Sequence, residues 1–243
     1  MSLRTALFLI TARAGSKRLP NKNTLLLDGV PLLAYKVGAV RRSRLGAESP
    51  IIISTDAPEY ARIAAGYGVE APFLRPKALA TDRASSIDVV LHAMRCLEQQ
   101  DRAADVIVLL EPSTPFLTPE DVDGCDAFLG RARTEAVVTF SPHKIPSRYI
   151  APLAPGRRIG PLLAKLSNGA RATHGAEYTP NGMLYLSRWE AFKRRRSFYH
   201  ERTQAYITPA ERSVEIDLPM DWLYAQAYAE TPAWRSACQG ALV

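Results

Sequence analysis

A chain of 243 residues, 47% of them hydrophobic, is long enough to bury one sizeable core, and α/β folds of this length commonly form a single domain. The formal net charge of +7 favours an anionic partner, which leaves nucleic acid, a phospholipid surface and a phosphorylated small molecule open. The three cysteines are far apart in the sequence and odd in number, which excludes a readable disulfide framework or Cys-x-x-Cys metal site.

The first predicted element is a buried strand at residues 6–11, which runs into the basic loop TARAGSKRLPNKN at residues 11–23. Its apolar run of about five residues is too short for a signal peptide or a membrane span, so we expect a soluble, cytoplasmic protein. The loop carries Arg13, Lys17, Arg18 and Lys22. A strand that feeds a basic, glycine-containing loop can present backbone N–H groups and cations to phosphates, and a solvated basic loop is the alternative.

Short apolar runs and helical patterns then alternate along the chain. Strands are predicted at residues 51–55, 106–110 and 136–140, and helices at residues 31–42, 58–67, 86–99 and 119–131. Thr118, followed by Pro119, is a predicted helix N-cap. The alternation is typical of a mainly parallel sheet covered by helices on both faces, which is a three-layer α/β/α fold of the Rossmann-like type.

Two polar segments lie where predicted strands give way to loops. They are RPKALATDRASS at residues 75–86 and LLEPSTPF at residues 109–116. In open α/β sheets this edge binds ligands, so we expect both segments to contribute to a site. Ser85 and Ser86 have an alternative role as caps of the helix that follows.

The pattern fails between residues 141 and 180, where four prolines precede Gly160 and no period is clear. A long irregular stretch inside a compact domain is usually a functional loop, a lid or a docking arm. Strands are predicted again at residues 182–187 and 214–218, followed by a helix at residues 220–229. We therefore expect one domain over residues 1–243, with residues 141–180 as an insertion or arm.

The segment VEID at residues 214–217 alternates apolar and acidic side chains, so on a strand Glu215 and Asp217 share one face. Two carboxylates on one face repel each other unless a cation or water lies between them. Mg²⁺ typically takes one or two carboxylates and fills its other positions with water and phosphate oxygens. The pattern therefore predicts a magnesium site, with an exposed edge strand as the alternative.

Several other kinds of site are not supported. The chain has neither a GxxxxGK[ST] loop nor a GxGxxG after the first strand, which argues against a Walker loop and a dinucleotide dehydrogenase. The four histidines have no ligand-like spacing, so we expect no zinc site. A basic nucleic-acid-binding protein would use the run KRRR at residues 193–196, but this run is more simply the solvated face of a helix.

Five of the segments, taken in order, resemble the acylneuraminate cytidylyltransferases, also called CMP-sialic acid synthetases. ARAGSKRLPNKN is similar to the family's nucleotide-binding signature, RPKALATDRASS to its second motif, LLEPSTP to its third, YTPNGMLY to its fourth and VEIDLPMDW to its metal-binding motif. The resemblance runs from about residue 5 to residue 230. It implies a nucleotidyltransferase fold and the reaction of CTP with a sialic-acid-like nonulosonic acid, which yields a CMP-sugar and pyrophosphate.

The resemblance also implies a set of site residues. Catalysis would rest on Arg13, Lys22 and Asp217, with Mg²⁺, or alternatively Mn²⁺, on Glu215 and Asp217. The nucleotide would contact Arg13, Ala14, Gly15, Ser16, Lys22, Asn23, Arg75, Ala84 and Ser86. The sugar acid would contact Glu111, Arg148, Arg171, Asn181, Tyr185, Phe198 and Tyr199. The family's homodimers imply that residues 141–180 cross to a partner subunit; neither a nucleic acid nor a membrane is an expected partner.

Three residues depart from the family's pattern. Ala14 replaces a glycine, Glu215 replaces the first aspartate of the metal motif, and Glu111 replaces a glutamine beside the sugar. The third departure leaves the sugar open among neuraminic, legionaminic, pseudaminic and other nonulosonic acids. The related 3-deoxy-manno-octulosonate cytidylyltransferases are the nearest alternative, since Arg18-Leu19-Pro20 would suit them, although Asn23 fits the acylneuraminate pattern better.

Overall fold

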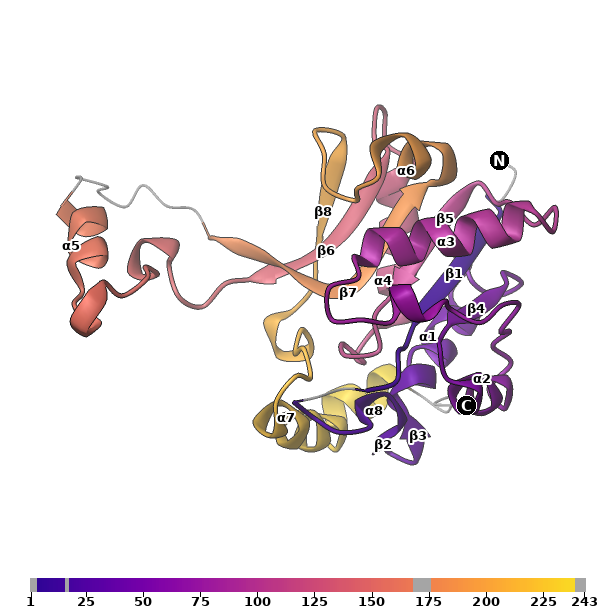
Figure 1. The fold of residues 1–243 in the computed structure, drawn as a ribbon, viewed down its shortest axis with the longest axis horizontal. Helices are drawn as coiled ribbons and strands as arrows, with labels where there is room; N and C mark the ends of the chain where they lie inside the picture. Colours follow the sequence, from indigo (N-terminus) through magenta and orange to yellow (C-terminus); the bar gives the residue numbers. More distant parts are fainter. Residues whose placement is uncertain (1–3, 16–17, 168–175, 239–243) are drawn as a thin grey trace.

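The computed structural model describes residues 4–15, 18–167 and 176–238, and its centre is one six-stranded sheet (Figure 1). The strand order is β4-β1-β5-β7-β6-β8. The strands are β1 (Ala6–Thr11), β4 (Ile51–Ser54), β5 (Val106–Leu110), β6 (Ala136–Pro142), β7 (Tyr178–Arg188) and β8 (Thr203–Ile207). β1 pairs in parallel with β4 and β5, and β6 with β8, whereas β7 is antiparallel to both neighbours. The predicted α/β class with a mainly parallel sheet is confirmed.

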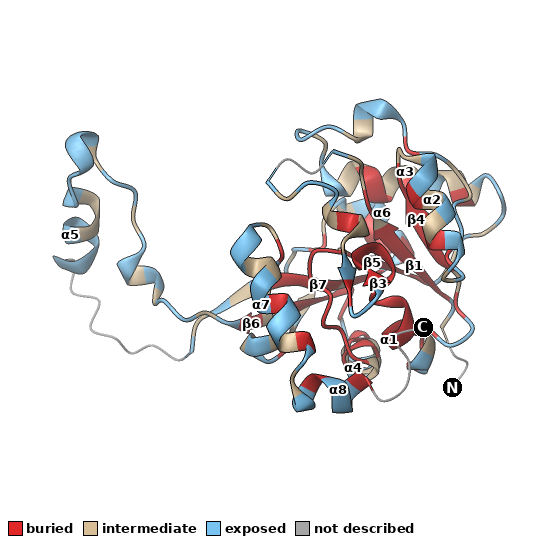
Figure 2. Ribbon diagram, turned by 90° about the horizontal axis from the view of Figure 1, so that it is seen from below, coloured by how far each residue is buried: buried red, intermediate tan, exposed pale blue. Residues whose placement is uncertain are grey.

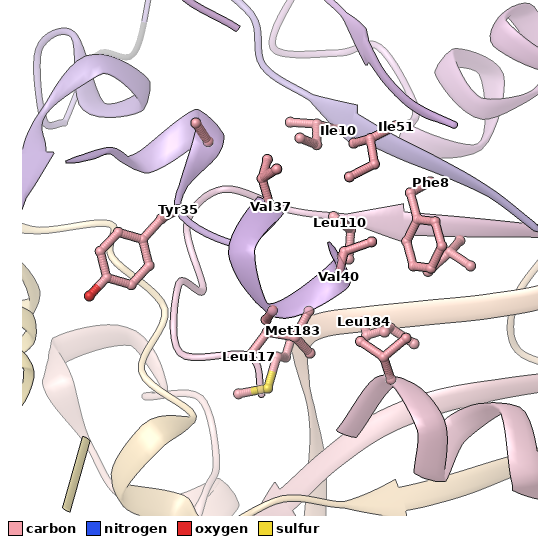
Figure 3. Close-up of a cluster of buried hydrophobic side chains, with 14 of the residues drawn as sticks. Phe8, Ile10, Tyr35, Val37, Val40, Ile51, Leu110, Leu117, Met183 and Leu184 are labelled. Carbon is pink, nitrogen blue, oxygen red and sulfur yellow. The ribbon is translucent and has the colours of Figure 1, made fainter. Parts of the chain in front are cut away.

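Helices cover both faces of the sheet, and β1 and β5 are therefore buried on both sides. Phe8 and Ile10 point into one core cluster, which α1, α4 and α7 help to close, and Figure 3 shows part of it. Leu7 and Leu9 point into a second cluster with residues of α3 and α6. The helices are α1 (Val37–Arg42), α2 (Pro58–Ala65), α3 (Ser86–Glu98), α4 (Pro119–Leu129), α6 (Trp189–Arg195), α7 (Pro219–Ala229) and α8 (Pro232–Cys238). None of the helices in the described ranges is long and apolar enough to cross a membrane.

The prediction of a strand at residues 214–218 is wrong. This segment is extended but belongs to neither sheet, and its backbone contacts the loop after β5 instead, where Ile216 N donates to Ser113 O at 2.7 Å. The alternation that suggested a strand is real, since Ile216 is fully buried and its two acidic neighbours are not. Alternation reports which face is buried and does not require a neighbouring strand. The predicted helix at residues 31–42 also divides, into a 3-10 turn (Leu32–Ala34) and α1.

The chain between β6 and β7 forms an arm that projects from the body of the molecule (Figure 1). It contains two 3-10 turns (Ser147–Tyr149 and Pro155–Arg157) and the helix α5 (Gly160–Ser167), which the sequence did not predict. Figure 2 shows that the described part of the arm is largely exposed. Its exposed side chains include Ile145, Ile150, Leu153, Leu163 and Leu166. None of these apolar side chains belongs to either core cluster of the described residues.

A buried ion pair ties the start of α4 to the chain that precedes α7. Thr118 caps α4 as predicted, in a capping box with Asp121, whose carboxylate accepts from Thr118 N at 2.9 Å. The same carboxylate, only 2% exposed, pairs with Arg212, whose Nη2 lies 2.9 Å from Oδ1. Arg212 therefore balances a buried negative charge as well as linking two distant segments.

We expect Arg212→Ala to lower the free energy of unfolding by about 3–5 kcal/mol, because it leaves the Asp121 carboxylate buried and unpaired. The matched control is Arg44→Ala, which removes an exposed arginine 3.2 Å from Asp123 on the same helix and should cost less than about 1 kcal/mol. Urea unfolding of both variants measures the difference. Equal losses would show that the Arg212 pair contributes no more than a surface pair.

Candidate functional site

The predicted polar segments meet at the carboxyl ends of β1 and β5. Ala14 N, in the loop after β1, donates to Asp56 Oδ1 after β4 at 2.9 Å, and Asn23 Nδ2 donates to Arg13 O at 3.1 Å. The segment that carries Glu215 contacts the loop after β5, because Ile216 N donates to Ser113 O as described above. Parallel strands end at the same edge of a sheet, so segments far apart in the sequence become neighbours there.

A cavity of about 180 Å³ opens beside the first loop. Its lining includes four of the predicted nucleotide residues, Arg13, Arg75, Ala84 and Ser86, together with Thr11, Leu79, Thr81, Asp82 and Val89. Ser85, by contrast, caps α3 through a 3.1 Å hydrogen bond from Ile87 N, so the capping alternative holds for this serine. The cavity brings residues of the first and second motifs together.

Two arginines give this cavity its charge. Arg75 is 6% exposed and its Nε donates to Ser54 Oγ at 3.1 Å. Burial lowers the pKa of Arg75 to about 10, which leaves the guanidinium charged at neutral pH. Arg13 Nη2 lies 2.7 Å from Asp82 Oδ1, in an ion pair that is partly open to solvent. A bound anion would therefore compete with Asp82 for Arg13.

The basic loop also meets the acidic segment. Lys22 Nζ lies 2.9 Å from Asp217 Oδ1, and Arg18 Nη2 lies 3.1 Å from Asp217 Oδ2. The pKa of Glu215 is raised, first by desolvation and then by the negative charge of Asp217. Two oxygen donors that repel each other suit a hard divalent cation, which would remove that repulsion. Within the described ranges no group of three or more His, Cys, Asp or Glu side chains could hold a metal, so a metal here would need further oxygens from water or from a ligand.

Glu111 lies at the end of β5, close to the backbone of β7. Its Oε2 is 3.1 Å from the position that a Cβ on Gly182 would take, and Gly182 has a φ of +72°. Only glycine combines this backbone conformation with this close approach at low cost. Burial raises the pKa of Glu111, and the charge of Lys36 is the first influence that lowers it. The basic residue Arg13, in the loop after β1, forms its ion pair with Asp82.

Aromatic residues predicted for the sugar lie beside Glu111. The rings of Tyr185 and Tyr199 are 6.2 Å apart and nearly perpendicular, and Tyr199 is 51% exposed. Phe198 is 5% exposed and packs between Tyr185 and Phe192, at centroid distances of 5.3 Å and 4.5 Å. Burial, and then the charge of Glu111, raise the pKa of the Tyr185 phenol, so this hydroxyl stays protonated. Tyr199 therefore offers an exposed ring beside Tyr185, and Phe198 packs against Tyr185.

The remaining predicted residues lie elsewhere. Asn181 is buried, and its amide is used within the fold, by donating to Thr208 Oγ1 at 2.7 Å and accepting from Met183 N at 3.1 Å. Arg148 lies on the arm, with its guanidinium 4.7 Å from the Tyr149 ring centre, and the arm points away from its own site (Figure 1). Two of the predicted residues, Ser16 and Arg171, lie outside the described residues.

Sequence reasoning missed Lys36, which is buried under the site and donates to Thr114 Oγ1 at 2.9 Å. The available signal was a lysine inside the apolar segment LLAYKVGAV. A lysine is seldom buried without a partner, and the neighbouring residues in the sequence include no acidic side chain that could pair with it.

Comparisons with known proteins agree with this geometry. Residues 7–218 match the family described as cytidylyltransferase. The chain is 32% identical over 226 residues to the CMP-N,N'-diacetyllegionaminic acid synthase of Legionella pneumophila, a match that covers 92% of this chain and 96% of that protein. It is also 32% identical over 215 residues to the N-acylneuraminate cytidylyltransferase of Escherichia coli, covering 88% of this chain and 49% of that longer protein.

Among solved structures, a CMP:2-keto-3-deoxy-manno-octonic acid synthetase complexed with CTP aligns with a TM-score of 0.68. The alignment covers 93% of this chain and 100% of that one, at 16% sequence identity. At that identity the likeness supports the fold alone.

Proposed function

Because the chain belongs to the cytidylyltransferase family, we propose that it transfers the cytidylyl group of CTP to a nonulosonic acid, with release of pyrophosphate. The observation that carries this proposal is the meeting of a cationic loop and two carboxylates at the edge of the sheet, beside the cavity of Arg13 and Arg75. A triphosphate, a divalent cation and an acidic sugar each find complementary charge there. The nonulosonic acid class is supported by the names of the two relatives described above, each of which matches most of this chain.

In this reaction the C2 hydroxyl oxygen of the sugar acid forms a bond to the α-phosphorus and gives up its proton to water, and the bond from that phosphorus to pyrophosphate breaks in line. Little covalent chemistry falls to the protein, so catalysis rests on positioning and on stabilising charge. Arg13, Ser16 and Lys22 would hold the phosphates, and Ala14 and Gly15 would contact the nucleotide beside them. Asn23, Arg75, Ala84 and Ser86 would hold the cytidine.

Glu215 and Asp217 would hold the divalent cation, for which we propose Mg²⁺, with Mn²⁺ as the alternative. When bound, such an ion polarises the phosphoryl oxygens and helps to orient the two substrates. In the structure Asp217 is paired with Lys22 and Arg18. A cation that takes over the Asp217 carboxylate would release both basic groups toward the phosphates, so nucleotide and metal should bind cooperatively.

The sugar acid would lie against Glu111, Tyr185 and Tyr199, with Phe198 and Asn181 supporting them. We propose a homodimer in which the arm carries Arg148 and Arg171 to the partner's site, where they would face the sugar carboxylate. The exposed apolar side chains of the arm support this, since none of them belongs to a core cluster of the described residues. Light scattering in solution measures the mass, and a monomer at working concentration would contradict the arrangement.

The proposed function is tested by pyrophosphate release with CTP and a panel of sugar acids. The panel contains neuraminic, legionaminic and pseudaminic acids and 3-deoxy-manno-octulosonate. We expect turnover with at least one nine-carbon acid. Turnover with the eight-carbon acid alone would favour the 3-deoxy-manno-octulosonate enzyme, and salt-dependent binding of DNA or RNA without CTP turnover would favour a nucleic-acid-binding protein.

We expect Lys22→Ala to lower kcat by roughly 100- to 1000-fold, the scale seen when one preorganised charge-stabilising group is lost. The thermal midpoint should change little, because Lys22 lies in a single 3-10 turn (Lys22–Thr24) outside the sheet and pairs with a partly exposed carboxylate. The control is Lys193→Ala, which removes a lysine of α6 that pairs with Glu98 and should leave kcat unchanged. A collapse of stability in the Lys22 variant would make this lysine structural.

Activity should require a divalent cation, and Asp217→Asn should remove most of it, because an amide is a weaker ligand than a carboxylate for a hard cation. Turnover is measured with metal, with EDTA, and after metal is added back. Asp123→Asn, at an ion pair on α4, is the matched control. Near-normal turnover of the wild type in EDTA, or of the Asp217 variant, would contradict the assignment of the metal site.

Glu111→Gln should change the ranking of sugar acids and leave the kinetics for CTP intact. An ionised glutamate only accepts hydrogen bonds, whereas glutamine both donates and accepts, so sugars that present a carbonyl oxygen should gain. A matched hydrogen bond is worth about 1–3 kcal/mol, enough to reorder preferences by about tenfold. The measurement is kcat/KM for each acid. A uniform loss across all acids, or a change confined to CTP, would mean that Glu111 does not select the sugar.

A further inference from the structure

Lys36 is a buried cation behind the floor of the proposed sugar site. It lies between the 3-10 turn at Leu32–Ala34 and α1, and it is 3% exposed. Its sequence neighbours Tyr35 and Val37 belong to the core cluster, as Figure 3 shows. Burial lowers the pKa of Lys36 to about 7, against the opposing influence of the nearby carboxylates. Because burial disfavours the charged form of this amine, we expect polar partners that compensate for the lost hydration.

The hydrogen bonds of Lys36 go to two uncharged oxygens. Nζ donates to Thr114 Oγ1, in the loop after β5, at 2.9 Å, and to the backbone oxygen of Met183 in β7. Thr114 Oγ1 in turn lies 2.9 Å from Gly182 O and 3.2 Å from Glu111 O. The amine therefore fastens the backbone that carries Glu111 to the strand that passes beneath it.

The charges of three carboxylates act on Lys36, and two of these carboxylates are also influenced by other cations. The charge of Glu111 acts on Lys36 most strongly, followed by Asp121 and Glu215. Asp121 is already paired with Arg212. Glu215 feels the charges of Lys22 and Arg18. For Glu111, Lys36 is the cation with the largest influence, and no described residue forms a salt bridge with its carboxylate.

We infer that Lys36 is a positioning residue for sugar selection, because its buried amine ties the loop that begins at Glu111 to β7 and so holds Glu111 beside Gly182, with a basic group behind it. The inference rests on the function proposed above and extends it. Glu111 would otherwise be a buried carboxylate near two further carboxylates and an anionic substrate. With Lys36 beneath it, Glu111 presents an acceptor to a hydroxyl or amide N–H of the sugar acid and rejects a carbonyl oxygen at that position. Lys36 touches no substrate and acts only through Glu111.

A double-mutant cycle tests this coupling with Lys36→Met, Glu111→Gln and the double variant. Lys36→Met should lower kcat/KM for the preferred sugar acid by at least about tenfold, with KM for CTP changed less than about threefold. In the Glu111→Gln background, where there is no charge to balance, the same change should cost less than about threefold. Both single variants should shift the ranking of sugar acids in the same direction.

A lysine that serves only packing would behave differently. In that case Lys36→Met would lower kcat/KM by the same factor, and the unfolding midpoint by the same amount, whether residue 111 is glutamate or glutamine. The ranking of sugar acids would not change, and that result would overturn the inference. Thermal unfolding of the four proteins without substrate gives a second readout, in which the midpoint should fall less when Glu111 is already glutamine. If Lys36→Met folds only together with Glu111→Gln, the coupling is supported; if neither variant with methionine folds, Lys36 is structural and the inference is wrong.

The stability cycle needs no substrate, so its outcome is independent of the proposed function. If the wild type turns over none of the nonulosonic acids, the proposed function fails whatever the cycle gives. If the wild type is active and the two substitutions are additive, only the role of Lys36 fails.

Discussion

The parallel pairing of β1 with β5 is the constraint on which the rest of the site depends. Leu9 pairs with Leu109 and Ile10 with Leu110, so both strands end at the same height. Both are buried on two faces, which fixes their register against two core clusters at once. The basic loop after β1 and Glu111 after β5 therefore start from one edge, although about a hundred residues separate them in sequence.

The charges at this edge are balanced within the protein. Arg13 is paired with Asp82, and Lys22 and Arg18 are paired with Asp217. Such pairs are partly exposed and are worth little individually, so a triphosphate with several negative charges can displace the carboxylates. The pairs hold the cationic side chains near the positions where an anion would need them. A loop with the same cations and no carboxylates would repel itself and lose that order.

Much of the fold could be predicted because the strands of the first half are short apolar runs between helical patterns, and the cap at Thr118 is a local signal. The rest depends on contacts that are distant in sequence. The segment of Glu215 and Asp217 has the alternation of a strand but lies against the loop after β5. Lys36 looks misplaced in an apolar run because its partners Thr114 and Met183 are 78 and 147 residues away. Phe198 is buried whereas its neighbour Tyr199 is exposed, a difference that their adjacent aromatic side chains do not reveal in the sequence because it depends on packing.

The long strand β7 joins two features that the body of the sheet does not explain, the arm and the floor of the proposed sugar site. Between the pairs Val138 with Tyr185 and Phe140 with Pro180, β6 advances by two residues and β7 by five, so β7 is bulged there. The bulge contains Gly182, whose positive φ brings the backbone against Glu111, and Thr139 Oγ1 accepts the hydrogen bond of Leu184 N that the bulge leaves unpaired. Beyond the bulge the same strand leads back into the arm. β7 is therefore one continuous element that leads from the arm to Tyr185 and carries the backbone that lies against Glu111.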